Sequence, residues 1–213
     1  MIVHPGKKSA SNAARERSDP EGKIKIANAL KTLLQKKSFN SITTAEIAKT
    51  AGVNEALIYR YYKNKRGLLH NILSQYLLDS ELQLKLCLRD VNGTFNKLKK
   101  AIWFQFDTYN KNRIFAKIHV IEVRNFPGYF QSETYFSAKK YSDVVLKLVK
   151  EGIANGEIRD DIPAWYIMQI ILGSCEHLFL PSLIFDREID IDSCTESICQ
   201  ILLQGVFKVE SAS

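Results

Sequence analysis

The residues best suited to chemistry lie at 44–62, where polar side chains follow the spacing of a helix-turn-helix. Ala48 is small enough for a second helix to cross the first, and Gly52 can take the positive φ that the turn needs. Ile58 would hold the second helix to the core. Such a helix can enter a DNA major groove, although an ordinary helical hairpin is the alternative. Its outward positions are Asn54, Glu55, Ala56, Tyr59 and Arg60.

Charge is distributed unevenly along the 213 residues. Residues 1–66 contain 14 Lys and Arg against 5 Asp and Glu and carry +9, whereas residues 67–213 contain 16 against 18 and carry −2. A basic end attracts polyanions such as nucleic acid or anionic lipid. Residues 1–20 are polar and basic, which predicts a flexible basic arm. The alternative is that this arm only keeps the protein soluble.

Motifs for enzyme chemistry are absent from the sequence. It has no Gly-x-Ser-x-Gly elbow, no glycine-rich phosphate loop and no His-Glu-x-x-His pair. Cys175 and His177 are two positions apart and would not share a helix face, so they do not predict a metal site. We therefore expect a protein that is not an enzyme and that has no metal and no cofactor.

The chain carries no evident targeting or membrane segment. Residues 1–22 lack the apolar core of a signal peptide, and the longest apolar run, 164–175, is too short to span a bilayer. The four cysteines form no Cys-x-x-Cys pair and are expected to be reduced thiols. The sequence predicts a cytoplasmic protein with no membrane partner.

Apolar residues recur at helical spacing, and no segment alternates as a strand would. Thr43 and Glu46 form a predicted capping box at the start of one helix, and Gly52 would end that helix. Asn54 and Asn64 would cap the next two helices. The sequence therefore predicts an all-α fold of about nine helices. They are placed near 23–37, 43–51, 54–62, 64–86, 94–110, 112–124, 132–153, 163–180 and 192–208.

Residues 23–70 resemble the DNA-binding domain of TetR/AcrR-type transcriptional regulators. The most specific stretch is Leu57-Ile58-Tyr59-Arg60-Tyr61-Tyr62-Lys63-Asn64-Lys65, followed by Leu68. It is preceded by Thr43-x-x-Glu46-Ile47-Ala48 and by Ala51-Gly52-Val53-Asn54. The chain departs from the family pattern at Ser38, Ile42, Asn54 and Ala56, where the family more often has Gly, Thr, Ser and Gly.

The resemblance implies a three-helix DNA-binding domain at 21–66 and a larger helical domain at 67–213 that binds a ligand and dimerises. In this family, the equivalents of Thr43, Tyr59, Tyr61 and Lys65 commonly touch phosphates, and those of 54–56 and 60 face bases. The predicted DNA-binding residues are Thr43, Thr44, Asn54, Glu55, Ala56, Tyr59, Arg60, Tyr61 and Lys65.

Aromatic residues are concentrated in the larger domain, because twelve of the 22 in the chain lie at 95–141. Helices rich in aromatics can wall a cavity for an apolar or aromatic ligand, although a plain core is the alternative. The stretch 122–124 is also loosely similar to acyl-CoA-responsive fatty-acid regulators of the family. Polar groups within apolar stretches complete the predicted ligand site. Its residues are Trp103, Phe106, Phe115, His119, Glu122, Tyr135, Tyr141, Glu176 and His177.

The last two predicted helices are apolar over more than one face, which predicts a four-helix bundle between two copies of the chain. The predicted dimer residues are Ile167, Ile171, Leu178, Ile198, Ile201, Leu202 and Val206. Together these features predict a homodimeric repressor that a small apolar or aromatic effector, with acyl-CoA and fatty acids as candidates, releases from a palindromic double-stranded DNA operator. The alternative is a helical small-molecule-binding protein with only non-specific DNA binding.

Overall fold

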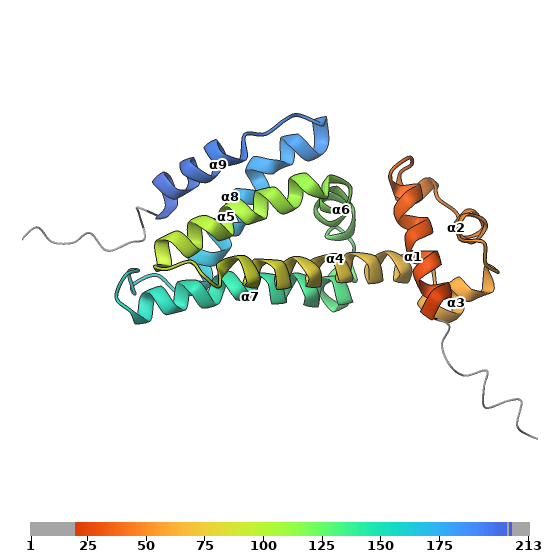
Figure 1. Cartoon of the computed structure of the whole chain (residues 1–213), viewed down its shortest axis with the longest axis horizontal. Helices are drawn as coiled ribbons and strands as arrows, with labels where there is room; N and C mark the ends of the chain where they lie inside the picture. The colour runs from red at the N-terminus through yellow and green to blue at the C-terminus, as the bar shows by residue number, and fades with distance from the viewer. Residues whose placement is uncertain (1–19, 204, 206–213) are drawn as a thin grey trace, which may run out of the picture. The chain divides into compact units, whose positions relative to one another are not determined.

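The computed structural model describes residues 20–203 and 205, and this part of the chain forms nine α-helices and no strand (Figure 1). The predicted all-α fold is therefore confirmed. The chain divides between Leu69 and His70 into two compact units. The division falls within α4 (Lys65–Leu88), a helix that begins in the first unit and continues into the second.

The first unit contains α1 (Pro20–Leu34), the 3-10 turn η1 (Phe39–Ser41), α2 (Thr44–Ala51), α3 (Ala56–Tyr62) and the first turn of α4. Its core is made of fully buried aliphatic side chains. Ile26 and Leu30 come from α1, Ile47 from α2, Ile58 from α3 and Leu68 from α4. Burial of one such side chain stabilises the fold by about 1.5–3 kcal/mol. These contacts hold the helix-turn-helix against α1.

The ends of α2 follow the local signals in the sequence. Thr43 Oγ1 accepts a hydrogen bond from the Glu46 backbone N–H at 3.1 Å, as predicted. The Glu46 carboxylate differs from the prediction, since it accepts from the Lys37 ammonium at 2.6 Å instead of reaching back to Thr43. A charged donor makes the stronger hydrogen bond to a carboxylate. Gly52 ends α2 in the left-handed conformation, with φ 65° and ψ 36°.

Two asparagines cap the helices that follow, as predicted. Asn54 Oδ1 accepts from the Ala56 backbone N–H, and Asn64 Oδ1 accepts from the Gly67 backbone N–H, both at 2.8 Å. Gly67 also permits the tight corner between α3 and α4. A Cβ at this position would lie 2.0 Å from the Tyr62 carbonyl oxygen, so no other residue fits without moving the backbone.

The second unit contains the rest of α4 and five further α-helices. They are α5 (Thr94–Lys111), α6 (Arg113–Lys117), α7 (Glu133–Ala154), α8 (Ala164–Phe185) and α9 (Ile191–Ile198). Between α6 and α7 lie the π-helix η2 (Ile118–Val123) and the 3-10 turn η3 (Tyr129–Gln131), and the π-helix η4 (Cys199–Leu203) follows α9.

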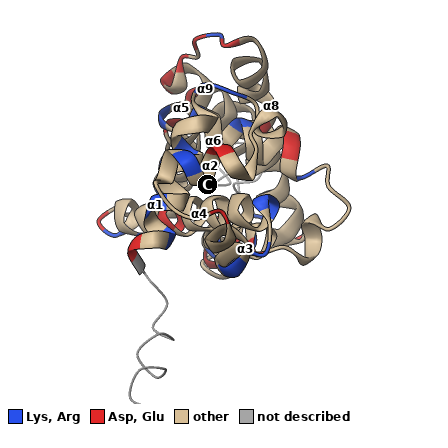
Figure 2. Cartoon of the chain, turned by 90° about the vertical axis from the view of Figure 1, so that its right-hand side faces the viewer, with Lys and Arg blue, Asp and Glu red and all other residues tan. Residues whose placement is uncertain are grey.

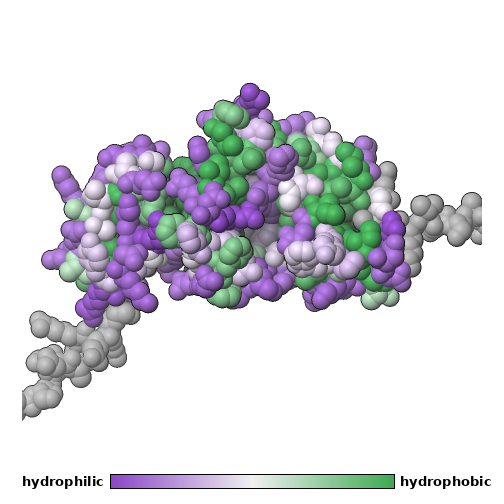
Figure 3. Space-filling model, turned by 180° about the vertical axis from the view of Figure 1, so that it is seen from behind, coloured by the Kyte–Doolittle hydropathy of each residue, from purple (hydrophilic) through white to green (hydrophobic). Residues whose placement is uncertain are grey.

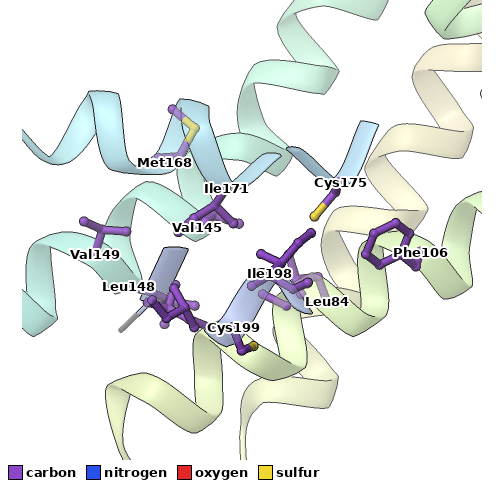
Figure 4. Packing of buried hydrophobic residues seen from close by; sticks show 14 of the residues in the cluster. Leu84, Phe106, Val145, Leu148, Val149, Met168, Ile171, Cys175, Ile198 and Cys199 are labelled. Atoms are coloured by element: carbon purple, nitrogen blue, oxygen red, sulfur yellow. The ribbon is translucent and has the colours of Figure 1, made fainter. Parts of the chain in front are cut away.

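One continuous apolar cluster forms the core of the second unit, and Figure 4 shows part of it. Leu84 of α4, Phe106 of α5, Val145 of α7, Cys175 of α8 and Ile198 of α9 all belong to it. Each of these helices therefore contributes one face to the same core. Burial raises the pKa of the Cys175 thiol to about 12, so this thiol stays protonated.

The structure changes three predicted helices in this unit. The one at 192–208 is α9 followed by the π-helix η4, and residues 206–208 lie outside the described residues. The predicted helix at 112–124 is α6 followed by the π-helix η2. The helix predicted to end at 180 runs through Pro181 and ends at Phe185, before Asp186 in the left-handed conformation. Pro181 removes the partner of the His177 carbonyl, and both residues are exposed, so water can replace the lost hydrogen bond.

Among the described residues, α8 is the one helix long and apolar enough to cross a membrane by length and composition. A core helix of a soluble domain passes the same test. The inner face of α8 contributes Met168, Ile171 and Phe179 to the core of the second unit.

Candidate DNA-binding surface and effector cavity

Inward contacts of α3 determine which of its side chains are available to DNA. Ile58 and Tyr62 are buried, and the Tyr62 hydroxyl donates to the Lys23 carbonyl of α1 at 3.0 Å. On the other side, Tyr59 is 51% exposed, and Arg60 is exposed too. The face of α3 that corresponds to the groove-entering face of a recognition helix is therefore exposed to solvent.

Hydrogen bonds hold several of the predicted DNA-binding side chains in place. The hydroxyl oxygens of Thr44 and Tyr59 are 3.3 Å apart, which joins the first turn of α2 to α3. The side-chain oxygens of Thr43 and Asn54 each cap a helix. Asn54 keeps its amide N–H groups free of that cap, so they remain able to donate to a base or a phosphate.

Basic side chains surround the same surface. Tyr61 is half-buried, with Lys23 Nζ 5.4 Å and the Arg60 guanidinium carbon 5.9 Å from its ring centroid. Beside it at the start of α3, Glu55 is half-buried and Ala56 is exposed. Residues 21–69 contain ten Lys and Arg against three Asp and Glu, and Figure 2 marks the basic residues in blue. A surface of this charge suits a phosphate backbone.

Lys65 has a structural role that the sequence did not predict. Its ammonium donates to the Phe39 carbonyl at 2.9 Å and to the Ile42 carbonyl at 2.6 Å. It also lies 4.4 Å from the Phe39 ring centroid. Two of its three N–H donors thus fasten the first turn of α4 to η1, and only one is left for the predicted phosphate contact.

The second unit contains a cavity of about 570 Å³. Residues of α4, α5, α7 and α8 and of the segment from η2 to η3 line it. Four predicted ligand residues belong to its wall, namely His119, Tyr135, Tyr141 and Glu176. The structure thus brings together in one wall residues that lie up to 57 positions apart in the sequence.

The other predicted ligand residues lie outside this cavity. Phe106 is fully buried in the core, Phe115 packs behind Tyr76 with ring centroids 5.6 Å apart, and His177 is exposed on α8. Glu122 is half-buried and does not reach the wall. The sequence marked them as aromatic or polar, but only packing decides which side of each helix faces the hollow.

Trp103 lies at a different place, where α5 meets α9. Its indole Nε1–H donates to the Asp192 carboxylate at 2.8 Å, and Lys100 Nζ lies 4.2 Å from its ring. Lys99 pairs with Glu196 beside it at 2.5 Å. These residues line a more open depression of about 440 Å³. Trp103 therefore fastens α9 to α5 and is not part of the larger cavity.

The larger cavity has an ion pair and a neutral histidine in its wall. Arg124 donates to the Glu176 carboxylate. Burial alone would lower the pKa of Arg124, but the Glu176 carboxylate raises it above its usual value, so the guanidinium stays charged. His119 Nε2 lies 3.1 Å from the Tyr129 hydroxyl. Burial, and secondarily the Arg124 charge, lowers the pKa of His119 to about 3, so its imidazole is neutral at physiological pH.

Sequence reasoning missed several wall residues. Gln105 and Arg124 were not among the predicted ligand residues, and neither were the tyrosines at 76, 109 and 129. Gln105 carried a usable signal, because it is a polar residue between Phe104 and Phe106 on a helix with an apolar face. Arg124 carried a weaker signal, since it lies in the stretch 122–124 that is loosely similar to acyl-CoA-responsive regulators. Its direction could not be read from the sequence, because the π-helix before it moves side chains off the regular helical spacing.

Three predicted dimer residues lie inside the subunit. Ile167, Ile171 and Ile198 are between 2% and 3% exposed and belong to the core of the second unit. They cannot contact a second copy, which corrects this part of the prediction. Other apolar side chains of α8, including Tyr166, Ile170 and Ile184, are exposed instead.

The remaining predicted dimer residues lie at or near the surface. Leu178 is 44% and Ile201 is 74% exposed, and Leu202 is half-buried. Val206 is outside the described residues. Figure 3 shows that the surface of the second unit includes areas of apolar side chains. An exposed apolar surface of this kind is typical of a protein interface.

Within the described residues, no three His, Cys, Asp or Glu side chains are grouped so that they could hold a metal ion. The arrangement consists of a basic helix-turn-helix and a helical unit that contains a cavity. Fold and site together define a DNA-binding transcriptional regulator with an effector domain.

Family models place the chain within that class. Residues 26–72 match the model of bacterial regulatory proteins of the tetR family, and residues 69–205 match the model of the YsiA-like protein C-terminal region. The chain belongs to the TetR/AcrR family, and the resemblance expected from residues 23–70 is confirmed. It is a ligand-responsive, DNA-binding transcriptional regulator.

Some of the proteins that the chain is similar to are named as regulators of fatty acid metabolism. Over 183 residues the chain is 21% identical to the fatty acid metabolism regulator protein of Bacillus subtilis strain 168, covering 86% of this chain and 94% of that protein. Its fold matches the crystal structure of the transcriptional regulator FadR from Bacillus subtilis in complex with stearoyl-CoA, with a TM-score of 0.76, 21% identity and 86% and 98% of the two chains covered. The fatty acid degradation regulator FadR from Bacillus halodurans matches with a TM-score of 0.77, 19% identity and 89% and 98% coverage.

Proposed function

We propose that this chain is a cytoplasmic repressor that leaves a palindromic operator when a fatty acid or an acyl-CoA fills the cavity. The course of α4 carries the proposal. The helix begins at Lys65 in the DNA-binding unit, and Tyr76, Leu77 and Ser80 of the same helix line the cavity. Ten residues of α4 separate Lys65 from Tyr76. A ligand that displaces the cavity end of α4 therefore moves the end that carries Lys65.

The Lys65 clamp supports this transmission. Its ammonium joins α4 to the Phe39 and Ile42 carbonyls, so the first turn of α4 and η1 move together. In a dimer, two recognition helices must match major grooves about 34 Å apart. A shift of α4 changes that match, and the ligand thereby favours a population that no longer fits the operator.

On the DNA side, we assign the exposed Arg60 to base contact and Tyr59 to the phosphate backbone. The basic side chains of Lys23 and Arg60 beside Tyr61 add positive charge. Thr43 and Thr44 lie at the start of α2, and the Thr44 hydroxyl contacts that of Tyr59 in the recognition helix. Loss of a base-reading Arg costs about 1–3 kcal/mol and relaxes preference at one position. Loss of a phosphate contact weakens binding to all DNA sequences alike.

Arg124 suits the acidic group of the proposed ligand. Its guanidinium is charged and lies in the wall of the cavity, where it now binds Glu176. A carboxylate or phosphate of the ligand can replace Glu176 as its partner, because guanidinium binds both in the same bidentate way. The complex of the Bacillus subtilis regulator with stearoyl-CoA supports this ligand class for a protein of the same fold.

We also propose that the functional molecule is a homodimer. On the outer stripe of α8, the side chains of Tyr166, Ile170 and Ile184 are each between 45% and 55% exposed. Leu178 of α8 and Ile201 of η4 are exposed as well. In a two-fold symmetric dimer, the same stripe of a second copy would pack against this one. Light scattering should give about twice the 24.3 kDa chain mass. Ile170→Asp should give monomers, whereas Ile24→Asp, at an exposed position of α1, should not.

The test of the whole proposal begins with selection of bound sequences from random DNA, followed by anisotropy titration of the selected operator. Long-chain acyl-CoA and the free fatty acid should each be tested for operator release, and the operator should weaken ligand binding by the same factor. Arg124→Met should bind the operator normally and lose release. Arg89→Met, at an exposed position of the same unit, is the matched control.

The alternative is a helical small-molecule-binding protein whose DNA binding is non-specific. It predicts that selection yields no palindrome and that DNA affinity falls steeply with salt for every sequence. If a palindrome is selected but no acyl compound releases the protein from it, the chain is a repressor and the proposed effector class is wrong.

A further inference from the structure

The wall of the cavity contains buried polar atoms that lack partners. Gln105, His119 and Tyr141 are 7%, 6% and 8% exposed. In the described part of the chain, Gln105 Oε1, His119 Nδ1 and the Tyr141 hydroxyl make no hydrogen bond. All three residues line the cavity, and they come from α5, η2 and α7. They therefore approach the same hollow from three different elements.

Other buried polar side chains of this unit do have partners. The Ser74 and Ser137 hydroxyls are 2.7 Å apart, and Thr134 Oγ1 lies 2.8 Å from His70 Nδ1. The Thr195 hydroxyl donates to a backbone carbonyl at 2.7 Å. Buried polar groups in folded proteins are paired as a rule. The unpaired atoms among residues 20–203 and 205 belong to Tyr76, Gln105, His119 and Tyr141, and all four side chains line the cavity.

The hydrogen-bonding capacity of these atoms determines which ligand groups can pair with them. The Gln105 amide oxygen accepts, the Tyr141 hydroxyl can donate and accept, and His119 Nδ1 does one or the other according to its tautomer. A saturated hydrocarbon chain offers these atoms no hydrogen-bond partner, and an unpaired buried polar group is costly. A hydroxyl group on the ligand can donate to Gln105 and accept from Tyr141 or His119.

We propose that the effector is a hydroxylated acyl compound, with its hydroxyl group inside the cavity. This inference rests on the proposed function. Arg124 takes the acidic end of the molecule, as proposed above. The apolar wall residues, such as Leu77, Leu146 and Leu172, cover the chain. The wall thus selects against a plain saturated acyl chain of the same length.

The test compares octadecanoic acid with its monohydroxy positional isomers by calorimetry and operator release. At least one isomer should bind roughly tenfold or more tightly than the saturated acid, the difference expected from one well-made hydrogen bond in a buried site. Tyr141→Phe and Gln105→Met should each reduce this ratio. Tyr166→Phe, at an exposed position of α8 outside the cavity wall, is the matched control and should leave the ratio unchanged.

Protein melting without ligand separates recognition from a folding defect. Because Tyr141→Phe removes a hydroxyl that has no partner, the variant should melt at or above the wild-type temperature. If octadecanoic acid and all isomers bind and release the operator equally, water satisfies the wall and the inference is wrong while the proposed function stands. If no member of the series binds but long-chain acyl-CoA releases the operator, the inference is wrong and the proposed function stands; if acyl-CoA fails as well, both fail.

Discussion

The neutral state of His119 makes the stability of the effector domain depend on pH. Its pKa is about 3 in the folded protein because of burial and the Arg124 charge, against 6.5 for a free histidine. The folded state therefore binds fewer protons than the unfolded state below pH 6.5, so stability is present above that pH and is lost as the pH falls toward 3. The effect does not depend on the exact folded value as long as it stays well below 5.

The magnitude follows from the two protonation equilibria. At pH 5 the histidine of the unfolded chain is about 97% protonated and that of the folded chain about 1%. The ratio of folded to unfolded molecules falls by about twenty-five-fold between pH 7 and pH 5, which is about 2 kcal/mol from this residue alone. Carboxylates also contribute to the measured change, so a variant must isolate the histidine.

His119→Gln removes the titrating group and keeps a polar side chain opposite Tyr129. Urea unfolding at pH 7 and pH 5 should show that the wild type loses about 2 kcal/mol more than this variant. Both tryptophans, Trp103 and Trp165, lie in the second unit, so their fluorescence reports on that unit. His177→Gln changes an exposed histidine on α8 and should lose as much as the wild type. Equal losses in the wild type and His119→Gln would refute the reasoning.

Three further substitutions test other parts of the structure. Gly67→Ala should abolish operator binding, because its Cβ would lie 2.0 Å from the Tyr62 carbonyl oxygen, whereas Gly128→Ala, with nothing within 4 Å, should bind normally in the same anisotropy assay. Lys65→Met should destabilise the DNA-binding unit by about 1–3 kcal/mol in urea unfolding followed by circular dichroism, because two backbone carbonyls lose their donor; weaker DNA binding at unchanged stability would instead indicate a phosphate contact alone. Phe179→Ala should cost about 3–5 kcal/mol by tryptophan fluorescence, because this side chain is fully buried in the core of the second unit, and a loss below about 1 kcal/mol would contradict that packing.

The helix-turn-helix was predictable because its signals are local. Thr43 caps α2 through an N–H three residues away, and Gly52 needs only its own backbone freedom to end that helix. Asn54 and Asn64 act over two or three residues in the same way. Interactions of this range are determined by neighbouring residues, so they can be read directly from the sequence.

The clamp made by Lys65 was not predictable in this way. Its carbonyl partners lie 23 and 26 positions earlier in the chain, so only folding brings them to the ammonium. The sequence indicated a cation near the DNA-binding surface, and the structure shows that most of its donors serve the fold.

The cavity and the outer face of α8 show the same limit more clearly. The spacing of apolar residues indicated that the second unit is helical and more apolar than one core-facing stripe requires, and the composition showed that it is rich in aromatics. Gln105 lines the cavity while its neighbour Phe106 is in the core, and Ile170 is exposed while Ile171 is buried. Consecutive residues on a helix point about 100° apart, so helical spacing gives the relative directions of side chains. Only the packing of five helices around one core fixes which direction faces the core, the cavity or the solvent, because that choice depends on contacts between residues far apart in the chain.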